Sequence, residues 1–156
     1  REGFIDRQDW RRDAVAMTAT HDLPTVAGWW RGIDIKFRAE QGLLADESEE
    51  EAARSAARKD LWRAFTAANI ASGTPPPLDT PGAVVDNAIA FVAGSSSPLV
   101  LLPLEDLLGL EAQPNVPGTI DEHPNWRRRY PVAAAEIFDA PEVAARAKVL
   151  SERDEA

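Results

Sequence analysis

Residues 13–20 read DAVAMTAT and residues 99–102 read LVLL, and these two short apolar runs decide the fold. Turn-forming residues bound each run, and proline flanks the second on both sides. Continuous apolar runs of this length are typical of parallel strands covered on both faces, whereas half-exposed strands alternate apolar and polar residues. We therefore predict two buried parallel strands.

Helical patterns occupy much of the remaining chain. The clearest covers residues 45–69, where Asp46 is the predicted N-cap and acidic residues precede basic ones along the helix. Its charged residues, including the i,i+4 pair Glu50–Arg54, are predicted to lie on a solvated face. The predicted apolar stripe comprises Ala57, Leu61, Ala64, Phe65 and Ala68. Further helices are predicted from Pro24 through Trp30, from Pro81 with Thr80 as the N-cap, and over residues 141–153.

Polar residues directly follow each predicted strand: His21-Asp22 after the first and Glu105-Asp106 after the second. In (β/α) barrels, the chemistry takes place at the C-terminal ends of the strands. A complete barrel needs about 250 residues, and this sequence offers only two strand candidates. The fold predicted is α/β: the C-terminal part of a (β/α)8 TIM barrel, with its last two strands plus helices, and rich in helix as an isolated chain.

We expect a single domain over residues 1–156, as a fragment of a larger catalytic barrel. The expected parts are a strand, loop and helix with the His-Asp motif (1–40), a helical insertion (41–94), the last strand and a substrate loop (95–130), and a C-terminal helix (131–156). The prolines and the glycine of the substrate loop exclude one regular element, so we expect an ordered but irregular segment.

The composition excludes several classes of function. The chain has 156 residues, a formal net charge of −9 and no cysteine. The charge argues against nucleic acid and membrane surfaces as partners, and the lack of cysteine removes thiolate nucleophiles and cysteine-ligated metal sites. His21 and His123 have no short-spaced partner ligand, so we expect neither a metal nor a cofactor. No signal-peptide or membrane-spanning pattern is visible, and we expect a cytoplasmic protein.

Two blocks of sequence carry a resemblance to a known family. The first reads TATHDLPT at residues 18–25, followed by GWW at 28–30. The second reads LEDLLG at 104–109, QPNVPGT at 113–119 and HPNWRRR at 123–129. Both resemble segments of the amylomaltases, which are the 4-α-glucanotransferases of glycoside hydrolase family 77. The blocks occur in the family's order, each after a predicted strand, and the resemblance spans roughly residues 13–130.

The resemblance implies an enzyme that transfers α-1,4-glucan segments between maltodextrins by a retaining double-displacement mechanism, with maltooligosaccharides as partners. It implies that Asp22 is the carboxylate that stabilises the transition state and that His21 is its sugar-binding neighbour. Asn115 and Pro117 would line the sugar subsites, and Trp29 is a candidate for stacking on glucose. The family's nucleophile and acid/base match no residue of this chain, so the resemblance implies that the isolated chain is inactive.

Each candidate also has a purely structural interpretation. Asp22 is a possible cap of the helix near Pro24. Glu105 or Asp106 is a possible cap of the short turn that follows this acidic pair. Trp62 is expected in the core and Trp126 is expected to fix its loop. Arg127, Arg128 and Arg129 are expected to pair with acidic neighbours such as Asp121 or Glu122.

Two other functions stay open from the sequence. One is a non-catalytic glucan-binding module, and the other is a purely structural fragment. Two strands taken from a barrel expose sheet edges and apolar faces. We therefore expect the isolated chain either to self-associate or to rearrange into a largely helical form.

Overall fold

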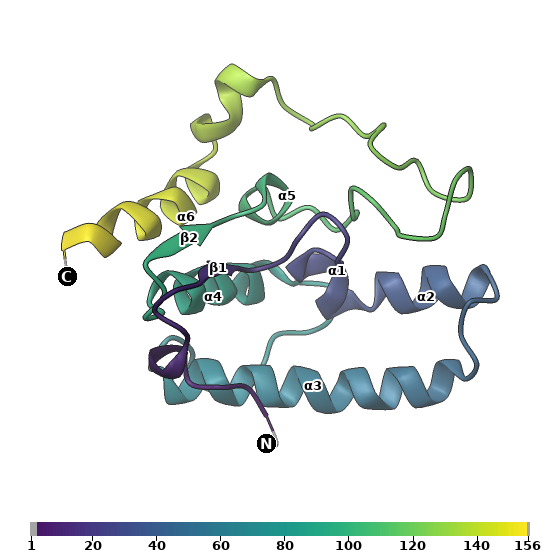
Figure 1. Ribbon diagram of the computed structural model, residues 1–156, viewed down its shortest axis with the longest axis horizontal. Coiled ribbons are helices and arrows are strands. Elements are labelled where there is room, and N and C mark those ends of the chain that lie inside the picture. The colour runs from purple at the N-terminus through teal and green to yellow at the C-terminus, as the bar shows by residue number, and fades with distance from the viewer. Residues whose placement is uncertain (1–2, 156) are drawn as a thin grey trace.

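Two three-residue strands form a parallel sheet in the computed structural model, which describes residues 3–155. Strand β1 (Val15–Met17) pairs with β2 (Leu99–Leu101), with Ala16 opposite Val100 in the register. The helices of the intervening chain form the crossover between the strands (Figure 1). The prediction of two parallel strands is confirmed, and the strands are retained rather than rearranged into helix.

Between the strands lie α1 (Val26–Arg31), α2 (Ile33–Glu40), α3 (Glu47–Ala67) and α4 (Gly82–Ala93). After β2 come α5 (Leu104–Leu107) and α6 (Pro141–Ser151). Short 3-10 turns η1, η2 and η3 cover Arg7–Asp9, Ala134–Asp139 and Glu152–Glu155. Residues 109–133 hold no helix or strand and run as a long loop above the sheet (Figure 1). In the part of the chain that the structure describes, no helix is both long and apolar enough to cross a membrane.

The sheet is covered on one face only, so the prediction that both strands are buried on both faces is wrong, whereas the expectation that strands taken from a barrel expose an apolar face is confirmed. Successive side chains of a strand point to opposite faces. Ala16 is 3% exposed on the face toward α4, whereas Val15 and Leu99 are each 50% exposed and Leu101 is 47% exposed on the other face. Among residues 3–155, no helix or strand buries these side chains, and Met17 and Leu101 line an open cavity together with loop residues such as Tyr130.

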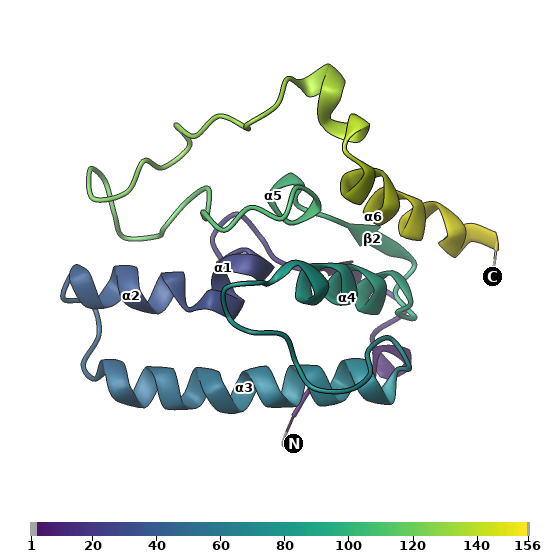
Figure 2. The same ribbon diagram turned by 180° about the vertical axis from the view of Figure 1, so that it is seen from behind.

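The core lies between α3, α4 and α1, with α4 between the sheet and α3 in both views (Figures 1 and 2). The cluster at its centre comprises Trp30, Phe65, Val84, Ala88 and Phe91. The predicted stripe of the long helix therefore faces the core, as expected, and Trp62 packs at its margin. A smaller cluster of Leu107, Ile137 and Val143 attaches α6 to α5.

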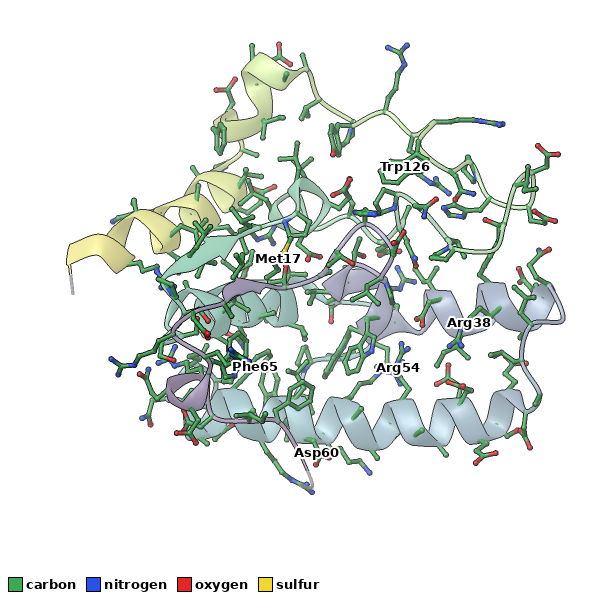
Figure 3. All side chains as sticks on the ribbon, in the orientation of Figure 1. Met17, Arg38, Arg54, Asp60, Phe65 and Trp126 are labelled. Carbon is green, nitrogen blue, oxygen red and sulfur yellow. The ribbon has the colours of Figure 1, made fainter. Side chains whose placement is uncertain are left out.

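Arg54 of α3 fixes the long helix against α1 and α2 (Figure 3). Its guanidinium forms a bidentate ion pair with Asp34 at 2.7 and 2.8 Å, donates to the carbonyl of Trp29 at 2.7 Å, and lies 4.7 Å from the centre of the Trp29 ring. The predicted Glu50–Arg54 pair is therefore wrong, because Glu50 contacts Arg38 instead. The charged residues of α3 do not all lie on a solvated face either, since Arg58 is also buried.

Of the two helix N-caps predicted for α3 and α4, one is confirmed and one is wrong. The Asp46 carboxylate accepts hydrogen bonds from the backbone N–H groups of Ser48 and Glu49, so the predicted cap of α3 is confirmed. The prediction for Thr80 is wrong, because its hydroxyl donates to the carbonyl of Pro77 and α4 starts at Gly82 without a side-chain cap.

Candidate functional site

The two sequence blocks meet beyond the C-terminal ends of β1 and β2. One segment is the loop over residues 18–25, and the other runs from α5 through residue 115. The N-cap of α1 is Thr25, whose hydroxyl accepts from the N–H of Gly28 at 3.0 Å. Asp22 therefore does not cap this helix, and its carboxylate is free for other partners.

Side chains more than 90 residues further along the chain hold Asp22 in place. The side-chain amide of Asn115 donates to one carboxylate oxygen of Asp22 at 2.6 Å, and Gln113 donates to the Asp22 backbone carbonyl at 3.2 Å. The ring of His21 lies on the other side, with Nε2 3.3 Å from the second carboxylate oxygen. Since the side chain of Asp22 is about half exposed, a fixed carboxylate faces solvent at the end of the strands.

An aromatic pair stands beside this carboxylate. The rings of His21 and Trp126 lie 5.2 Å apart at 49°, and Trp126 is 65% exposed with a φ of 60°. The Trp126 N–H donates to the carbonyl of Pro114 at 3.0 Å, which fixes this part of the loop. The prediction that Trp126 fixes its loop is thus consistent with a backbone hydrogen bond, while its ring is left open to solvent.

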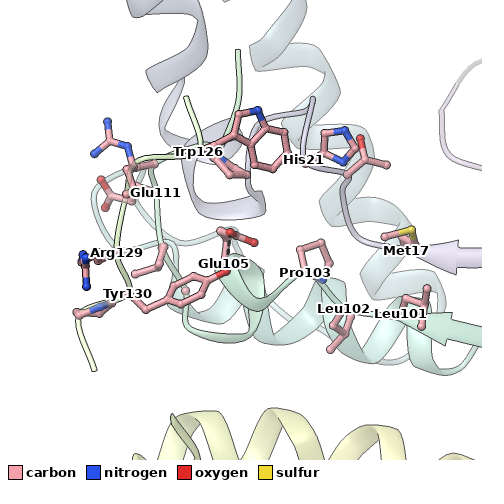
Figure 4. A pocket seen from close by; sticks show the side chains of 17 residues that line it. Met17, His21, Leu101, Leu102, Pro103, Glu105, Glu111, Trp126, Arg129 and Tyr130 are labelled. Carbon is pink, nitrogen blue, oxygen red and sulfur yellow. Dashed lines mark hydrogen bonds between the residues drawn. The ribbon is translucent and has the colours of Figure 1, made fainter. Parts of the chain in front are cut away.

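A cavity of about 1410 Å³ opens beneath the aromatic pair (Figure 4). His21, Glu105, Glu111, Trp126 and Tyr130 line it, together with Met17 and Leu101 of the sheet. The hydroxyl of Tyr130 donates to Glu105 at 2.9 Å. Burial and the adjacent carboxylate raise the pKa of Tyr130.

A second cavity of about 540 Å³ lies on the side of α1 and α2. Asp22, Trp29 and Pro117 line it, together with Gln113 and His123. Because Arg54 stacks on the Trp29 ring, part of the aromatic surface of Trp29 is already used in packing. The predicted site residues are thus divided between two cavities, with His21 on the first and Asp22, Trp29 and Pro117 on the second.

A comparison with models of known protein families identifies the family of this chain. A model described as 4-alpha-glucanotransferase matches residues 1–134, which is most of the chain. The chain belongs to the 4-alpha-glucanotransferase family.

Individual glucanotransferases agree with this assignment. The 4-alpha-glucanotransferase of Mycobacterium tuberculosis is 33% identical over 125 residues, which are 79% of this chain and 17% of that protein. The 4-alpha-glucanotransferase of Haemophilus influenzae is 28% identical over 150 residues, covering 88% of this chain and 21% of that protein. The chain therefore spans about a fifth of the length of these relatives.

The fold agrees as well. The crystal structure of amylomaltase from Corynebacterium glutamicum superposes on 95% of this chain and 23% of its own length, with a TM-score of 0.81 and 23% sequence identity. The helices and the small parallel sheet thus have the arrangement of a part of that amylomaltase.

Hydrogen bonds within the second sequence block hold its loop together. The side chain of Asn125 accepts from Val116 N–H at 2.9 Å and donates to the carbonyl and the hydroxyl of Thr119 at 3.0 and 2.9 Å. His123 is buried, with Nε2 2.9 Å from the Gln113 carbonyl and its ring edge-on to Phe37. Within residues 3–155, no three His, Asp or Glu side chains gather closely enough to hold a metal ion.

The expected ion pairs of the three arginines are absent from the part of the chain that the structure describes, which corrects the prediction for Arg127, Arg128 and Arg129. The Glu122 carboxylate turns back on its own loop and accepts from the N–H groups of Ile120 and Asp121. These hydrogen bonds lower the pKa of Glu122.

Of the two residues offered as a possible cap of the turn after them, Glu105 or Asp106, Asp106 does not serve as one. Asp106 is fully buried and accepts hydrogen bonds from Thr18 and from the first residue of α1, Val26. Sequence reasoning noticed the Glu105-Asp106 pair only because it follows a strand. The spacing contains no sign that its partners lie 80 and 88 residues away.

Proposed function

We propose that this chain is the part of a 4-α-glucanotransferase that carries the carboxylate Asp22 and much of the sugar-binding surface. The reaction is the transfer of α-1,4-glucan segments between maltodextrins by a retaining double displacement. The observation that carries this proposal is the Asp22 carboxylate, half exposed and oriented by Asn115 at 2.6 Å, in a chain of the glucanotransferase family.

The chemistry explains why such a carboxylate is useful. Glycosyl transfer passes through a transition state resembling an oxocarbenium ion, in which positive charge develops on the sugar ring. A carboxylate already fixed in place stabilises this charge without reorganising at the moment of reaction. It also accepts strong, charge-assisted hydrogen bonds from sugar hydroxyls. Asn115 contacts one oxygen of Asp22 and His21 lies 3.3 Å from the other, and the half-exposed carboxylate still has lone pairs open to sugar hydroxyls.

Among residues 3–155, no carboxylate near Asp22 is placed as its catalytic partner: Glu111 lines both cavities, but its carboxylate is paired with Arg31. Asp106 is fully buried with both oxygens occupied, so it does not contact a substrate. Glu105 lines the larger cavity, but Asp22 lines the other one, and Glu105 already accepts a hydrogen bond from Tyr130. We propose that the nucleophile and the acid/base come from sequence outside these 156 residues, and that the chain alone has no transferase activity.

The uncovered sheet face supports the finer proposal for the fold. We propose that β1 and β2 are the last two strands of a (β/α)8 barrel and that Val15, Met17, Leu99 and Leu101 point into its interior. In such barrels, layers of apolar side chains from several strands fill the centre. The relatives' greater length leaves room for the remaining strands. Without them, the chain is expected to self-associate through this face, which light scattering over a concentration series would measure.

The first experiment is incubation with maltotriose, followed by chromatography of glucose and longer maltodextrins. Two samples are compared: the 156-residue chain, and a chimera in which it replaces the matching segment of the Mycobacterium tuberculosis relative. We expect disproportionation by the chimera alone. Activity of the isolated chain would overturn the proposal, because it would require a complete catalytic site within these residues.

Variants of the chimera test the role of Asp22. Asp22→Asn keeps the size of the side chain and removes its charge, and we expect activity to fall by at least about 100-fold. The matched control is Asp79→Asn, an exposed aspartate on the loop before α4. Equal activity of the two variants would remove the proposed role of Asp22.

A non-catalytic glucan-binding role for the chain is favoured by one observation. Trp126 presents a 65% exposed ring next to His21 at the rim of the large cavity, and such rings stack on the apolar faces of glucose. Titration of the isolated chain with maltoheptaose, followed by tryptophan fluorescence, tests it. Saturable quenching that Trp126→Ala abolishes would support binding, and no response at millimolar sugar would exclude it.

A further inference from the structure

The buried carboxylate of Asp106 joins the two ends of the loop that carries His21 and Asp22. One oxygen accepts from the hydroxyl of Thr18 at 2.5 Å, just after β1. The other accepts from the N–H of Val26 at 2.8 Å, the first residue of α1. The loop between these two anchors thus starts and ends on a single side chain.

Other contacts also fix this loop, among them the hydroxyl of Thr25, which donates to the Glu111 carbonyl at 3.2 Å. Within it, the N–H of Leu23 donates to the Thr20 carbonyl at 3.1 Å. Beyond it, Gln113 and Asn115 hold Asp22 from the same strand-to-loop segment that bears Asp106. Asp106 therefore anchors the base of the loop while Asn115 holds its tip, and both belong to the second sequence block.

A carboxylate in this place is unfavourable for stability alone. Asp106 is fully buried, and moving a carboxylate out of water is costly even when it is hydrogen-bonded. This burial raises the pKa of Asp106, against the opposing effect of its hydrogen bonds with Thr18 and Val26. Neither oxygen satisfies a group of its own helix, since both serve the loop. The side chain is thus used for placing the loop rather than for closing α5.

We propose that Asp106 is a positioning residue for the reaction: it holds both ends of the 18–26 loop so that the Asp22 carboxylate meets the sugar in the productive orientation. This inference rests on the proposed glucanotransferase function. Misplacing a catalytic group by about 1 Å can cost about 100-fold in rate. The effect of Asp106 is therefore expected in kcat, because substrate contacts elsewhere in the two cavities stay in place.

The first test follows the geometry of the loop in the 156-residue chain, without any substrate. Carbon-13 NMR of the Asp22 carboxyl and proton NMR of the Asn115 side-chain amide report on their 2.6 Å hydrogen bond. We expect Asp106→Ala to shift both signals. Asp106→Asn preserves both contacts, because its amide oxygen accepts from Val26 and its NH2 group donates to Thr18, so it should leave the signals near their original positions.

Two further variants keep this test decisive. Thr18→Val removes one anchor while Asp106 stays in place, and an intermediate shift is expected even where Asp106→Ala does not fold. Asp86→Ala is the matched control, because in the part of the chain that the structure describes Asp86 pairs with Arg146 and forms no hydrogen bond or ion pair with the loop. Unchanged Asp22 and Asn115 signals in folded Asp106→Ala or Thr18→Val would overturn the proposal.

The second test measures kinetics in the chimera with the Mycobacterium tuberculosis relative. We expect Asp106→Ala to lower kcat by about 10- to 100-fold with little change in KM, and Asp106→Asn to restore most of the activity. A folded Asp106→Ala variant with unchanged kcat would contradict the proposal. An inactive parent chimera would count against the glucanotransferase function itself, whereas the NMR result would still decide whether Asp106 positions Asp22.

Discussion

The layer formed by α3 and α4 and the loop over residues 109–133 are held in opposite ways. The helices meet through buried apolar side chains such as Phe65, and a partly buried ion pair of Arg54 fixes them to α1 and α2. The loop buries few side chains and depends on polar contacts, of which Asn115–Asp22 is one. Apolar burial contributes most of the stability of a domain, whereas hydrogen bonds add little net free energy and fix the orientation of the groups they join. The helical layer is therefore expected to determine stability, and the loop contacts to determine the geometry of the site.

The strongest test of this comparison removes the centre of the helical layer. Phe65 is fully buried between the rings of Trp62 and Phe91. Phe65→Ala should lower the free energy of unfolding by about 4 kcal/mol, because it removes buried area and leaves a cavity. Urea denaturation followed by circular dichroism measures this. Phe138→Ala, at a 58% exposed position, is the matched control. Equal losses from both variants would break the comparison.

The ion pair between α2 and α3 comes next. Asp34→Asn should cost about 3 kcal/mol, since it leaves the Arg54 guanidinium largely buried without its counter-charge. Replacing both partners, as Asp34→Leu with Arg54→Met, should recover most of the loss because no unpaired charge remains. Chemical denaturation of the single and double variants provides the measurement. A double variant no more stable than Asp34→Asn would show that the contacts of Arg54 with Trp29 matter more than its charge.

A third change acts where the two regions touch. A Cβ added at Gly28 of α1 would collide with the carbonyl oxygen of Glu111. Gly28→Ala should therefore cost about 2 kcal/mol and move the loop, which would displace Asn115 from Asp22. Thermal unfolding measures the first effect, and the NMR signals of Asn115 measure the second. Gly82→Ala is the control, because nothing lies within 4 Å of a Cβ there. A shift of the Asn115 signals in that variant too would argue against a specific collision.

The pH dependence of stability sharpens the contrast further. Burial, and to a smaller extent Glu105, raise the pKa of Asp106, while Thr18, Val26 and Arg146 lower it, with a net rise above 3.8. A carboxyl with a raised pKa in the folded state favours folding most when protonated, and this contribution is lost as the pH rises through the folded pKa. The melting temperature of Asp106→Asn relative to the original chain should thus increase from acidic to neutral pH. A constant difference across this range would contradict the raised pKa.

The smallest effect is expected on the uncovered face of the sheet. Leu99 and Leu101 are about half exposed, so replacing both with threonine should change the stability of the isolated chain by less than about 0.5 kcal/mol. The same change should weaken self-association and should damage the chimera, in which we expect this face to be buried. Denaturation and light scattering measure both effects. A large loss in the isolated chain would mean that the face is already covered.

Local patterns in the sequence predicted the elements well. Two strands, the long helix with its Asp46 cap and the buried stripe around Phe65 follow from short-range periodicity and from capping chemistry. The ion pairs could not be predicted from such local patterns, because Arg54 pairs with Asp34, 20 residues away, rather than with Glu50 on its own helix. Bidentate geometry at a largely buried position outweighs an exposed i,i+4 pair, and spacing along the chain carries no information about such a choice.

The site was predicted in part for a related reason. His21, Asp22 and Asn115 were named from their resemblance to one family, and the fold brings them together across 93 residues. Their roles stay predictions until activity is measured. The role of Asp106 was left open between a local cap and a chemical group, because its partners, Thr18 and Val26, come from the other block. The exposed apolar face of the sheet agrees with the expectation for two strands taken from a barrel, although the apolar runs alone predicted burial on both faces.

The close approach of Gly28 to the Glu111 carbonyl has a consequence for recombination between relatives. The segments around residues 18–28 and 104–115 contact each other at Gly28, where there is no room for a methyl group. The two segments are therefore expected to be compatible only when both come from the same parent. A crossover between them would join a helix from one parent to a loop from another. Productive exchanges are therefore expected to carry both segments together, and any replacement for the intervening α3 must keep the core contacts of Phe65 and the ion pair of Arg54.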